Sequence, residues 1–213
     1  MVYRREKECF KCCGYKVNKK SVNLVFSFGN KKLPKTTAIF NLCPSFCCPS
    51  RNLNLCQLTN PQRCYALKAE RLHPQVLGYR KRQFKFWKKC TVDSFFWKLA
   101  EEKGTRKIDI LRVSEAGDFR DQEDVDKLVS IANKLSYCGV KTYCYTARSD
   151  LNFSNRGELV VNGSNFMVDN CFKMGTFVKG VDETYAQYKC IMDCRKCSLC
   201  SEKGGKTIYV KMH

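Results

Sequence analysis

The chain has 213 residues, of which 44% are hydrophobic and 12% aromatic, so it can bury a core and does not have the composition of a disordered protein. Its 39 Lys and Arg against 20 Asp and Glu give a formal net charge of +19, which attracts polyanions and predicts nucleic acid, DNA or RNA, as a partner. No apolar run reaches the ~20 residues that span a bilayer, so no membrane association is expected.

The cysteine content is high, with 16 in the chain. The first residues, MVYRREKECFKCC, lack the apolar segment and the cleavage site of a secretory signal, so a cytoplasmic location is expected. In that reducing environment many cysteines indicate metal or redox chemistry. A secreted scaffold held by disulfides is disfavoured, because such proteins are usually shorter.

The first part of the chain, residues 1–42, is predicted to be a β-rich N-terminal extension. Hydrophobic residues alternate at period two in residues 21–28, and residues 36–42 are a second strand candidate. A single α/β domain is predicted for residues 43–213, beginning with a cysteine-rich loop over residues 43–64.

Helical signals follow this loop. Residues 64–72 predict a short helix that ends before Pro74. Further along, Asp93 can cap a helix that ends at Gly104.

A strand–helix–strand unit occupies residues 108–146. Residues 108–113 predict a buried strand, Asp121 caps a helix with one apolar face, and residues 140–146 predict the next strand. Such a unit implies parallel pairing and a right-handed crossover. Weaker strands are expected at two places, residues 158–161 and residues 166–168.

The C-terminal segment CIMDCRKCSLC, residues 190–200, is a candidate cluster-binding segment. It holds four cysteines at gaps of three, two and two residues: Cys190, Cys194, Cys197 and Cys200. Thiolates at such spacings can converge on one inorganic centre. Because one short segment supplies all four ligands, a [4Fe-4S] cluster is favoured over zinc. Zinc remains an alternative, since Cys9 and Cys12 can supply half of a zinc site with Cys197 and Cys200.

A second group of cysteines lies in the loop over residues 43–64. This loop contains three of the five prolines, so we expect that something other than secondary structure holds it. A second cluster is therefore predicted there, with ligands from Cys43, Cys48, Cys56 and Cys64.

The turn Ser114-Glu115-Ala116-Gly117-Asp118 directly follows the strand at residues 108–113. Ligands of parallel α/β sheets bind beyond the carboxyl ends of strands. The candidate cofactor-binding residues are Glu115, Gly117 and Asp118. The candidate catalytic residues are Glu115, Asp118 and Arg148, the last of which follows the next strand. The alternative is a βα turn whose carboxylate only caps a helix.

Cations alternate with aromatic residues in residues 79–89, as in surfaces that bind phosphates and stack bases. The candidate nucleic-acid contacts are Arg80, Lys81, Arg82, Lys85, Lys88 and Lys89. The alternative is an amphipathic helix with a solvated basic face and with Phe84 and Trp87 buried.

Three stretches of the chain together resemble the bacteriophage gene-product-88 family, over about residues 40–200. They are CYALKAER, RVSEAGDFRDQEDVDK and KTYCYTARS. The resemblance implies a viral or mobile-element origin. Related phage proteins look like degenerate radical-SAM partial barrels, which implies a compact, partial-barrel-like parallel sheet with helices.

On that analogy a cluster would be held by Cys48, Cys56 and Cys64, and the C-terminal array would hold an auxiliary cluster. The Glu115–Asp118 turn would bind the methionine end of S-adenosylmethionine. The gaps of seven residues between these cysteines depart from the CxxxCxxC spacing that is typical of radical-SAM enzymes.

The sequence thus predicts a viral iron–sulfur protein that associates with nucleic acid. One alternative is a radical-SAM-like redox enzyme acting on a nucleic acid or nucleotide, and another is a zinc-dependent nucleic-acid-binding protein. A cluster with an open coordination position would favour the enzyme, and fully cysteine-ligated clusters would favour the binding protein.

Overall fold

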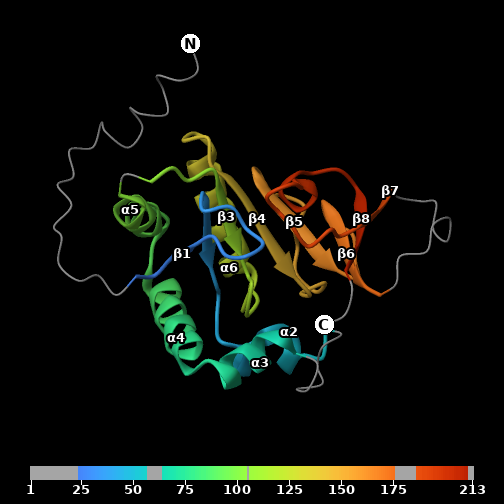
Figure 1. The fold of residues 1–213 in the computed structure, drawn as a ribbon, viewed down its shortest axis with the longest axis horizontal. Coiled ribbons are helices and arrows are strands. Elements are labelled where there is room, and N and C mark those ends of the chain that lie inside the picture. The colour runs from blue at the N-terminus through green and yellow to red at the C-terminus, as the bar shows by residue number, and fades with distance from the viewer. Residues whose placement is uncertain (1–23, 57–63, 105, 176–185, 211–213) are drawn as a thin grey trace, which may run out of the picture.

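The computed structural model describes residues 24–56, 64–104, 106–175 and 186–210. Eight strands form one sheet (Figure 1). They are β1 (Ser27–Phe28), β2 (Thr37–Phe40), β3 (Ile110–Val113), β4 (Lys141–Thr146), β5 (Leu159–Ser164), β6 (Asn170–Met174), β7 (Ala186–Lys189) and β8 (Lys206–Val210).

Five α-helices and two short 3-10 helices accompany the sheet in this part of the chain. They are η1 (Ser45–Cys47), α2 (Pro49–Asn52), α3 (Tyr65–Leu72), α4 (Pro74–Lys89), α5 (Val92–Lys103), α6 (Gln122–Ser136) and η2 (Leu199–Ser201). No described helix is long and apolar enough to cross a bilayer.

The strand order is β1-β2-β3-β4-β5-β6-β8-β7. Strand β1 pairs antiparallel with β2, and every other neighbouring pair is parallel. The α/β class predicted from the sequence is therefore confirmed. The described part of the N-terminal extension, residues 24–42, supplies β1 and β2 to the same sheet as the rest of the chain.

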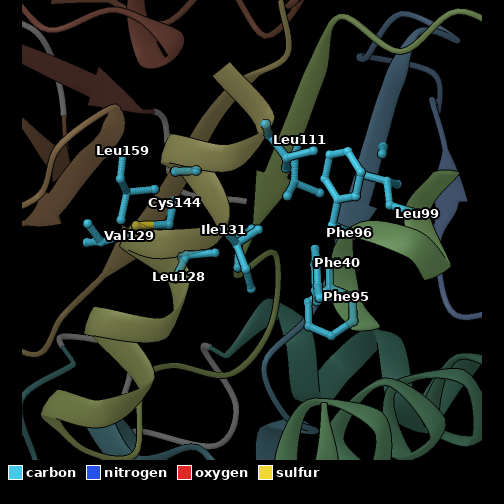
Figure 2. Close-up of a cluster of buried hydrophobic side chains, with 14 of the residues drawn as sticks. Phe40, Phe95, Phe96, Leu99, Leu111, Leu128, Val129, Ile131, Cys144 and Leu159 are labelled. Atoms are coloured by element: carbon cyan, nitrogen blue, oxygen red, sulfur yellow. The ribbon is translucent and has the colours of Figure 1, made fainter. Parts of the chain in front are cut away.

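The main core lies between one face of the sheet and helices α4, α5 and α6 (Figures 1 and 2). Leu111 and Cys144 project from β3 and β4 toward Leu128 and Ile131 of α6, and all four side chains are buried. The alternation of buried residues in β3 follows from the period of two residues in a strand.

Two of the described helices, α5 and α6, begin at a side-chain cap. The Asp121 carboxylate accepts a hydrogen bond from the backbone N–H of Asp124 at 2.9 Å and begins α6, as predicted. Helix α5 begins earlier than predicted, because the Thr91 hydroxyl accepts from the backbone N–H of Ser94 at 3.1 Å and the Ser94 hydroxyl accepts from the backbone N–H of Thr91 at 2.8 Å.

The last part of the sheet differs from the prediction. Residues 166–168 are not a strand; β6 begins at Asn170, after a turn in which Asn165 has a left-handed φ of 67°. Strands β7 and β8 were not predicted, because they flank the cysteine-rich segment and are ordered by pairing with each other and with β6. This pairing is a tertiary effect with little local signal.

The C-terminal cysteine segment covers the sheet face opposite the helices. In β3 and β4, alternation places Arg112, Tyr143 and Tyr145 on this second face, since Leu111 and Cys144 point toward the helices. The side-chain amide of Asn162 donates to the backbone carbonyl of Cys200 in the segment, and that of Asn170 donates to the carbonyl of Glu202 just after it, so the two amides hold this part of the chain against the sheet. The two faces of the sheet therefore have different roles: one is the core and the other carries cysteines.

Candidate functional site

All four cysteines of the C-terminal array line one cavity. The opposite wall comes from the sheet, with Thr37, Ile110 and Tyr143 contributed by β2, β3 and β4. Strand register explains this wall, because Thr37 lies beside Ile110 at the start of two parallel strands. The structure thus places all four cysteines of the array in the lining of one cavity.

Three cysteines of the array are fixed to different parts of the fold through their backbones. The N–H of Cys190 donates to the carbonyl of Tyr209 at 2.8 Å, and the N–H of Cys194 donates to the carbonyl of Lys32 at 2.9 Å. The carbonyl of Cys200 accepts from the side chain of Asn162 at 2.9 Å. Because satisfied backbone groups define the path of a loop, the array has a specified conformation.

The thiols of the array are electrostatically coupled. The pKa of Cys200 is raised to about 12, mainly by burial and also by the neighbouring cysteines of the array, while hydrogen bonding to the Tyr145 hydroxyl acts in the opposite direction. Burial likewise raises the pKa of Cys194, against which the Arg112 guanidinium acts. Converging thiolates repel each other in a buried site, and a bound metal cation would remove that repulsion.

The donor chemistry of the array fits a thiolate-bound iron–sulfur cluster or zinc ion. Across the described residues, however, no three His, Cys, Asp or Glu side chains are grouped closely enough to hold a metal ion. Cys9 and Cys12, the other half of the zinc alternative, lie outside the described residues.

A second pocket, of about 210 Å³, lies at the carboxyl ends of β3, β4, β5 and β6. Its walls include three of the cysteines predicted as ligands, together with the complete turn that follows β3: Cys48, Cys56, Cys64 and residues 114–118. Two segments about fifty or more residues apart in sequence therefore meet where parallel α/β sheets bind ligands. The cysteine loop and the Glu115–Asp118 turn thus line the same pocket.

The fourth predicted ligand of this group, Cys43, is not in the wall of the pocket. Its thiol interacts with those of Cys47 and Cys48, which raises the pKa of Cys43 and lowers the pKa of the other two. Gly117 packs directly on Cys43: a Cβ at Gly117 would lie 2.5 Å from the Cys43 backbone nitrogen. Cys43 is thus buried against Gly117 of the turn, and it is Cys48 and Gly117, not Cys43, that line the pocket.

The cysteine loop is held by a buried ion pair. The Arg80 guanidinium donates to Glu70 at 2.9 Å, and the Glu70 carboxylate accepts from the backbone and the hydroxyl of Ser45 at 2.9 and 2.6 Å. Arg80 is only 4% exposed. Its prediction as a nucleic-acid contact is therefore wrong, because the side chain turns inward to neutralise Glu70.

Asp118 is a buried carboxylate that ties the loop to the sheet. It accepts hydrogen bonds from the Ser50 hydroxyl, the Thr146 hydroxyl at 2.7 Å, and the backbone N–H groups of Ala147 and Phe119 at 2.8 and 2.9 Å. Burial raises the pKa of Asp118, and these hydrogen bonds act against that shift. With its acceptor sites occupied, Asp118 positions the cysteine loop at the pocket.

Arg148 was predicted as a catalytic candidate in the same cleft, and the structure places it elsewhere. Its guanidinium is paired with the Asp150 carboxylate at 2.8 Å and donates to the carbonyls of Phe119 and Arg120 at 2.5 and 2.8 Å. It is not in the wall of the pocket. Arg148 therefore joins the segment after β4 to the segment before α6.

Glu115 does line the pocket, and its nearest cation is a residue that the sequence analysis did not single out. The Glu115 carboxylate lies 3.6 Å from the Arg112 guanidinium, and Tyr65 donates to the Glu115 backbone carbonyl at 2.5 Å. Arg112, Tyr65 and Tyr145 are further walls of the pocket. Strand alternation could have identified Arg112, because it lies between Leu111 and Val113, both on the core face.

The comparisons with known proteins now bear on this geometry. A family model described as gene product 88 matches residues 13–165. The chain belongs to the gene product 88 family. No curated protein and no solved structure matches it. The match includes the cysteine loop and the turn after β3, and it ends before Phe172 and Met174 of the pocket and before the C-terminal array.

In this gene product 88 protein the basic stretch forms one face of α4. Its exposed cations are Lys81, Arg82, Lys85, Lys88 and Lys89. The aromatic residues are largely occupied with packing: Trp87 is buried, Phe86 packs against the core, and the Tyr79 hydroxyl donates to the carbonyl of Val25 at 3.0 Å. This face of α4 therefore carries exposed positive charge, as the amphipathic-helix interpretation predicts. Few of its aromatic rings are free to stack on bases.

Proposed function

We propose that this member of the gene product 88 family is an iron–sulfur protein of viral origin, in which the C-terminal array holds one [4Fe-4S] cluster. The ligands would be Cys190, Cys194, Cys197 and Cys200. The observation that carries the proposal is that these four residues line a single cavity while the backbones of Cys190, Cys194 and Cys200 are fixed to the sheet and to Lys32. Four thiolates complete the coordination of such a cluster, which suits structural support or electron transfer.

The test is anaerobic isolation of the full chain, followed by iron and acid-labile sulfide assays and an absorption spectrum. Brown protein with about four irons for this site is expected. Each of the four cysteines changed to Ser should lose that iron. Cys90→Ser is the matched control, because Cys90 is a buried thiol that contacts the carbonyl of Trp87 at 3.4 Å, away from the array. Colourless protein with stoichiometric zinc would contradict the proposal in favour of the zinc alternative.

Association with nucleic acid is the second part of the proposal, and it is supported by charge. The formal net charge is +19, and five cations of α4 are exposed on one helix face. Such a surface neutralises phosphates and releases counterions, which gives sequence-independent binding. The partner is therefore inferred as DNA or RNA bound through its backbone.

The test compares two variants that remove equal charge. One changes Lys81, Lys85 and Lys88 to Ala, and the other changes Lys31, Lys32 and Lys35 to Ala, all six of which are exposed. The first should lower the slope of log affinity against log salt by about one per lysine, and the second should have less effect. Equal losses would reject the α4 face as the contact surface, and no binding by wild-type protein at low salt would reject nucleic acid as a partner.

A redox enzyme is the second candidate function, and one observation favours it. The three cysteines that the radical-SAM analogy implies as cluster ligands, Cys48, Cys56 and Cys64, line the pocket at the carboxyl ends of the strands. Three thiolates leave one position of a [4Fe-4S] cluster open to a substrate or cofactor, such as S-adenosylmethionine. The chain itself would supply Glu115 as a carboxylate facing the ligand and Asp118 as the group that positions the loop.

The enzyme is tested by adding S-adenosylmethionine to the reduced protein and recording the electron paramagnetic resonance spectrum. A changed cluster signal is expected in the wild type and not in Cys64→Ser. If the wild-type signal is unchanged and iron is present only for the C-terminal array, the pocket holds no such cluster.

A further inference from the structure

Two polar atoms at the end of β3 are buried without hydrogen-bond partners: Arg112 Nε and Ser114 Oγ. Both residues line the 210 Å³ pocket, and they are two positions apart along the chain. A buried donor left unpaired costs about 1–3 kcal/mol, so native proteins rarely keep such groups without a reason. Two in one pocket indicate that a ligand completes their hydrogen bonding.

Arg112 lacks the close ion pair that four other arginines of the described chain make. The shortest ion-pair distances of the others are 2.9 Å for Arg80–Glu70, 2.6 Å for Arg120–Asp124, 2.8 Å for Arg148–Asp150 and 2.8 Å for Arg156–Asp169. The distance from Arg112 to its partner, Glu115, is 3.6 Å, which is too long for a hydrogen bond. The Arg112 side chain is only 17% exposed, so water does not replace the missing partner fully.

The orientation of the guanidinium is nevertheless fixed. It lies over the ring of Tyr145, with its central carbon 5.3 Å from the ring centroid. Tyr145 in turn packs edge-on against Phe172 at a centroid distance of 5.1 Å. Because stacking holds the plane of an arginine, its free N–H groups are preorganised for a planar or tetrahedral oxyanion.

Ser114 provides an independent observation. It is 5% exposed and has a left-handed φ of 63°, which is uncommon for a residue other than glycine. Such a conformation costs about 1 kcal/mol or more and tends to occur at ligand sites. This conformation turns the backbone directly after β3, and Ser114 lies in the wall of the pocket.

The remaining walls restrict the ligand. The Asp118 carboxylate is satisfied by four hydrogen bonds, and the Glu115 side chain is 29% exposed. Apolar surface comes from Phe172 and Met174 on β6. We infer that Arg112 and Ser114 bind the carboxylate or phosphate group of a small ligand whose apolar part lies against Phe172 and Met174. This inference gives the ligand class for the pocket of the second candidate function, and it does not require a cluster.

The test is isothermal titration calorimetry of the full chain as isolated, with inorganic phosphate and with hexanoate as separate probes. Hexanoate binding more tightly than phosphate identifies a carboxylate with an apolar body as the ligand, and the reverse order identifies a phosphate group. Arg112→Gln should weaken the better probe by about tenfold or more, since hydrogen bonds to charged groups carry that much affinity. Arg82→Gln is the control, because it removes one exposed positive charge from α4.

Ser114→Gly separates a binding role from a structural one. Glycine adopts a positive φ without penalty, so this variant should melt at an equal or higher temperature than the wild type while it binds the probe more weakly. Arg112→Lys serves where Arg112→Gln does not fold; it keeps the charge, loses the Nε donor and should still weaken the probe.

The inference is overturned if neither probe binds the wild type, or if Arg82→Gln loses as much affinity as Arg112→Gln. It is also overturned if Ser114→Gly binds as well as the wild type. Iron is assayed in every sample, so a failure of the iron–sulfur proposal is distinguished from a failure of anion binding.

Discussion

The side-chain amide of Asn162 donates a hydrogen bond to the backbone carbonyl of Cys200 at 2.9 Å and another to the carbonyl of Cys144 at 3.0 Å. Asn162 is fully buried in β5, and its own carbonyl oxygen accepts from Asn170 at 3.1 Å. One strand residue thus joins the sheet to the last cysteine of the C-terminal array. This contact couples the order of the array to the order of the sheet.

Asn162→Ala should therefore weaken both the fold and the proposed cluster. Three buried polar partners lose their hydrogen bonds, which destabilises a protein by about 1–3 kcal/mol or more. Urea unfolding measures the stability, and the iron content per chain measures the cluster. Gln75→Ala, an exposed change on α4, is the control. Full iron occupancy in Asn162→Ala would show that the array does not depend on this anchor.

The cysteines of the pocket should differ from their neighbours in the loop. If a second cluster forms, Ser in place of Cys48, Cys56 or Cys64 removes its iron and leaves the iron of the C-terminal array. Cys47→Ser should retain both, because Cys47 does not line the pocket. Iron and sulfide assays on anaerobic protein give the result, and full iron in all three pocket variants would assign these thiols to packing alone.

Gly117→Ala should be strongly destabilising, and Gly104→Ala is the control that separates steric clash from backbone strain. Gly117 and Gly104 both have positive φ values, 77° and 55°. A Cβ at Gly117 would meet the Cys43 backbone at 2.5 Å, whereas a Cβ at Gly104 has open space. Gly104→Ala should cost about 1 kcal/mol from backbone strain alone, and Gly117→Ala should cost clearly more. Thermal unfolding of the two variants checks the order, and equal costs would mean that the loop yields without penalty.

Acid sensitivity should depend on Asp124. Burial raises the pKa of this carboxyl, but hydrogen bonds from Arg120 and from the Trp87 indole at 2.8 Å outweigh burial and hold the pKa below its ordinary value of 3.8. A folded-state pKa below the unfolded value contributes stability above pH 3.8, and this contribution is lost as the pH falls through the folded-state value.

Asp124→Asn should accordingly be less stable than the wild type at neutral pH and should lose less stability between pH 5 and pH 2, by urea unfolding at each pH. Asp126→Asn is the control, because Asp126 is exposed on the same helix. A wild-type profile with the same slope as Asp124→Asn would exclude this carboxyl as the source of the acid sensitivity.

Features governed by local chemistry were predicted from the sequence. The strand–helix–strand unit over β3, α6 and β4 formed as expected, and Asp121 capped α6. The four closely spaced C-terminal cysteines line one cavity, and the match to gene product 88 agrees with the motifs that suggested it. In each case the deciding interactions lie within a few residues, or a periodic pattern repeats often enough to set the exposed and buried faces.

Other features were decided only by the tertiary structure. Arg80 and Lys81 are adjacent cations, yet one neutralises a buried Glu70 and the other faces solvent, because the helix turns them by about 100°. Arg148 was predicted to line the cleft but is bound by the Asp150 carboxylate and the Phe119 carbonyl, whereas Arg112, for which no role was predicted, lines the pocket with its Nε unpaired. Composition and spacing determine which side chains can bind charge or metal, whereas the packing of distant segments determines which of them remain available to do so.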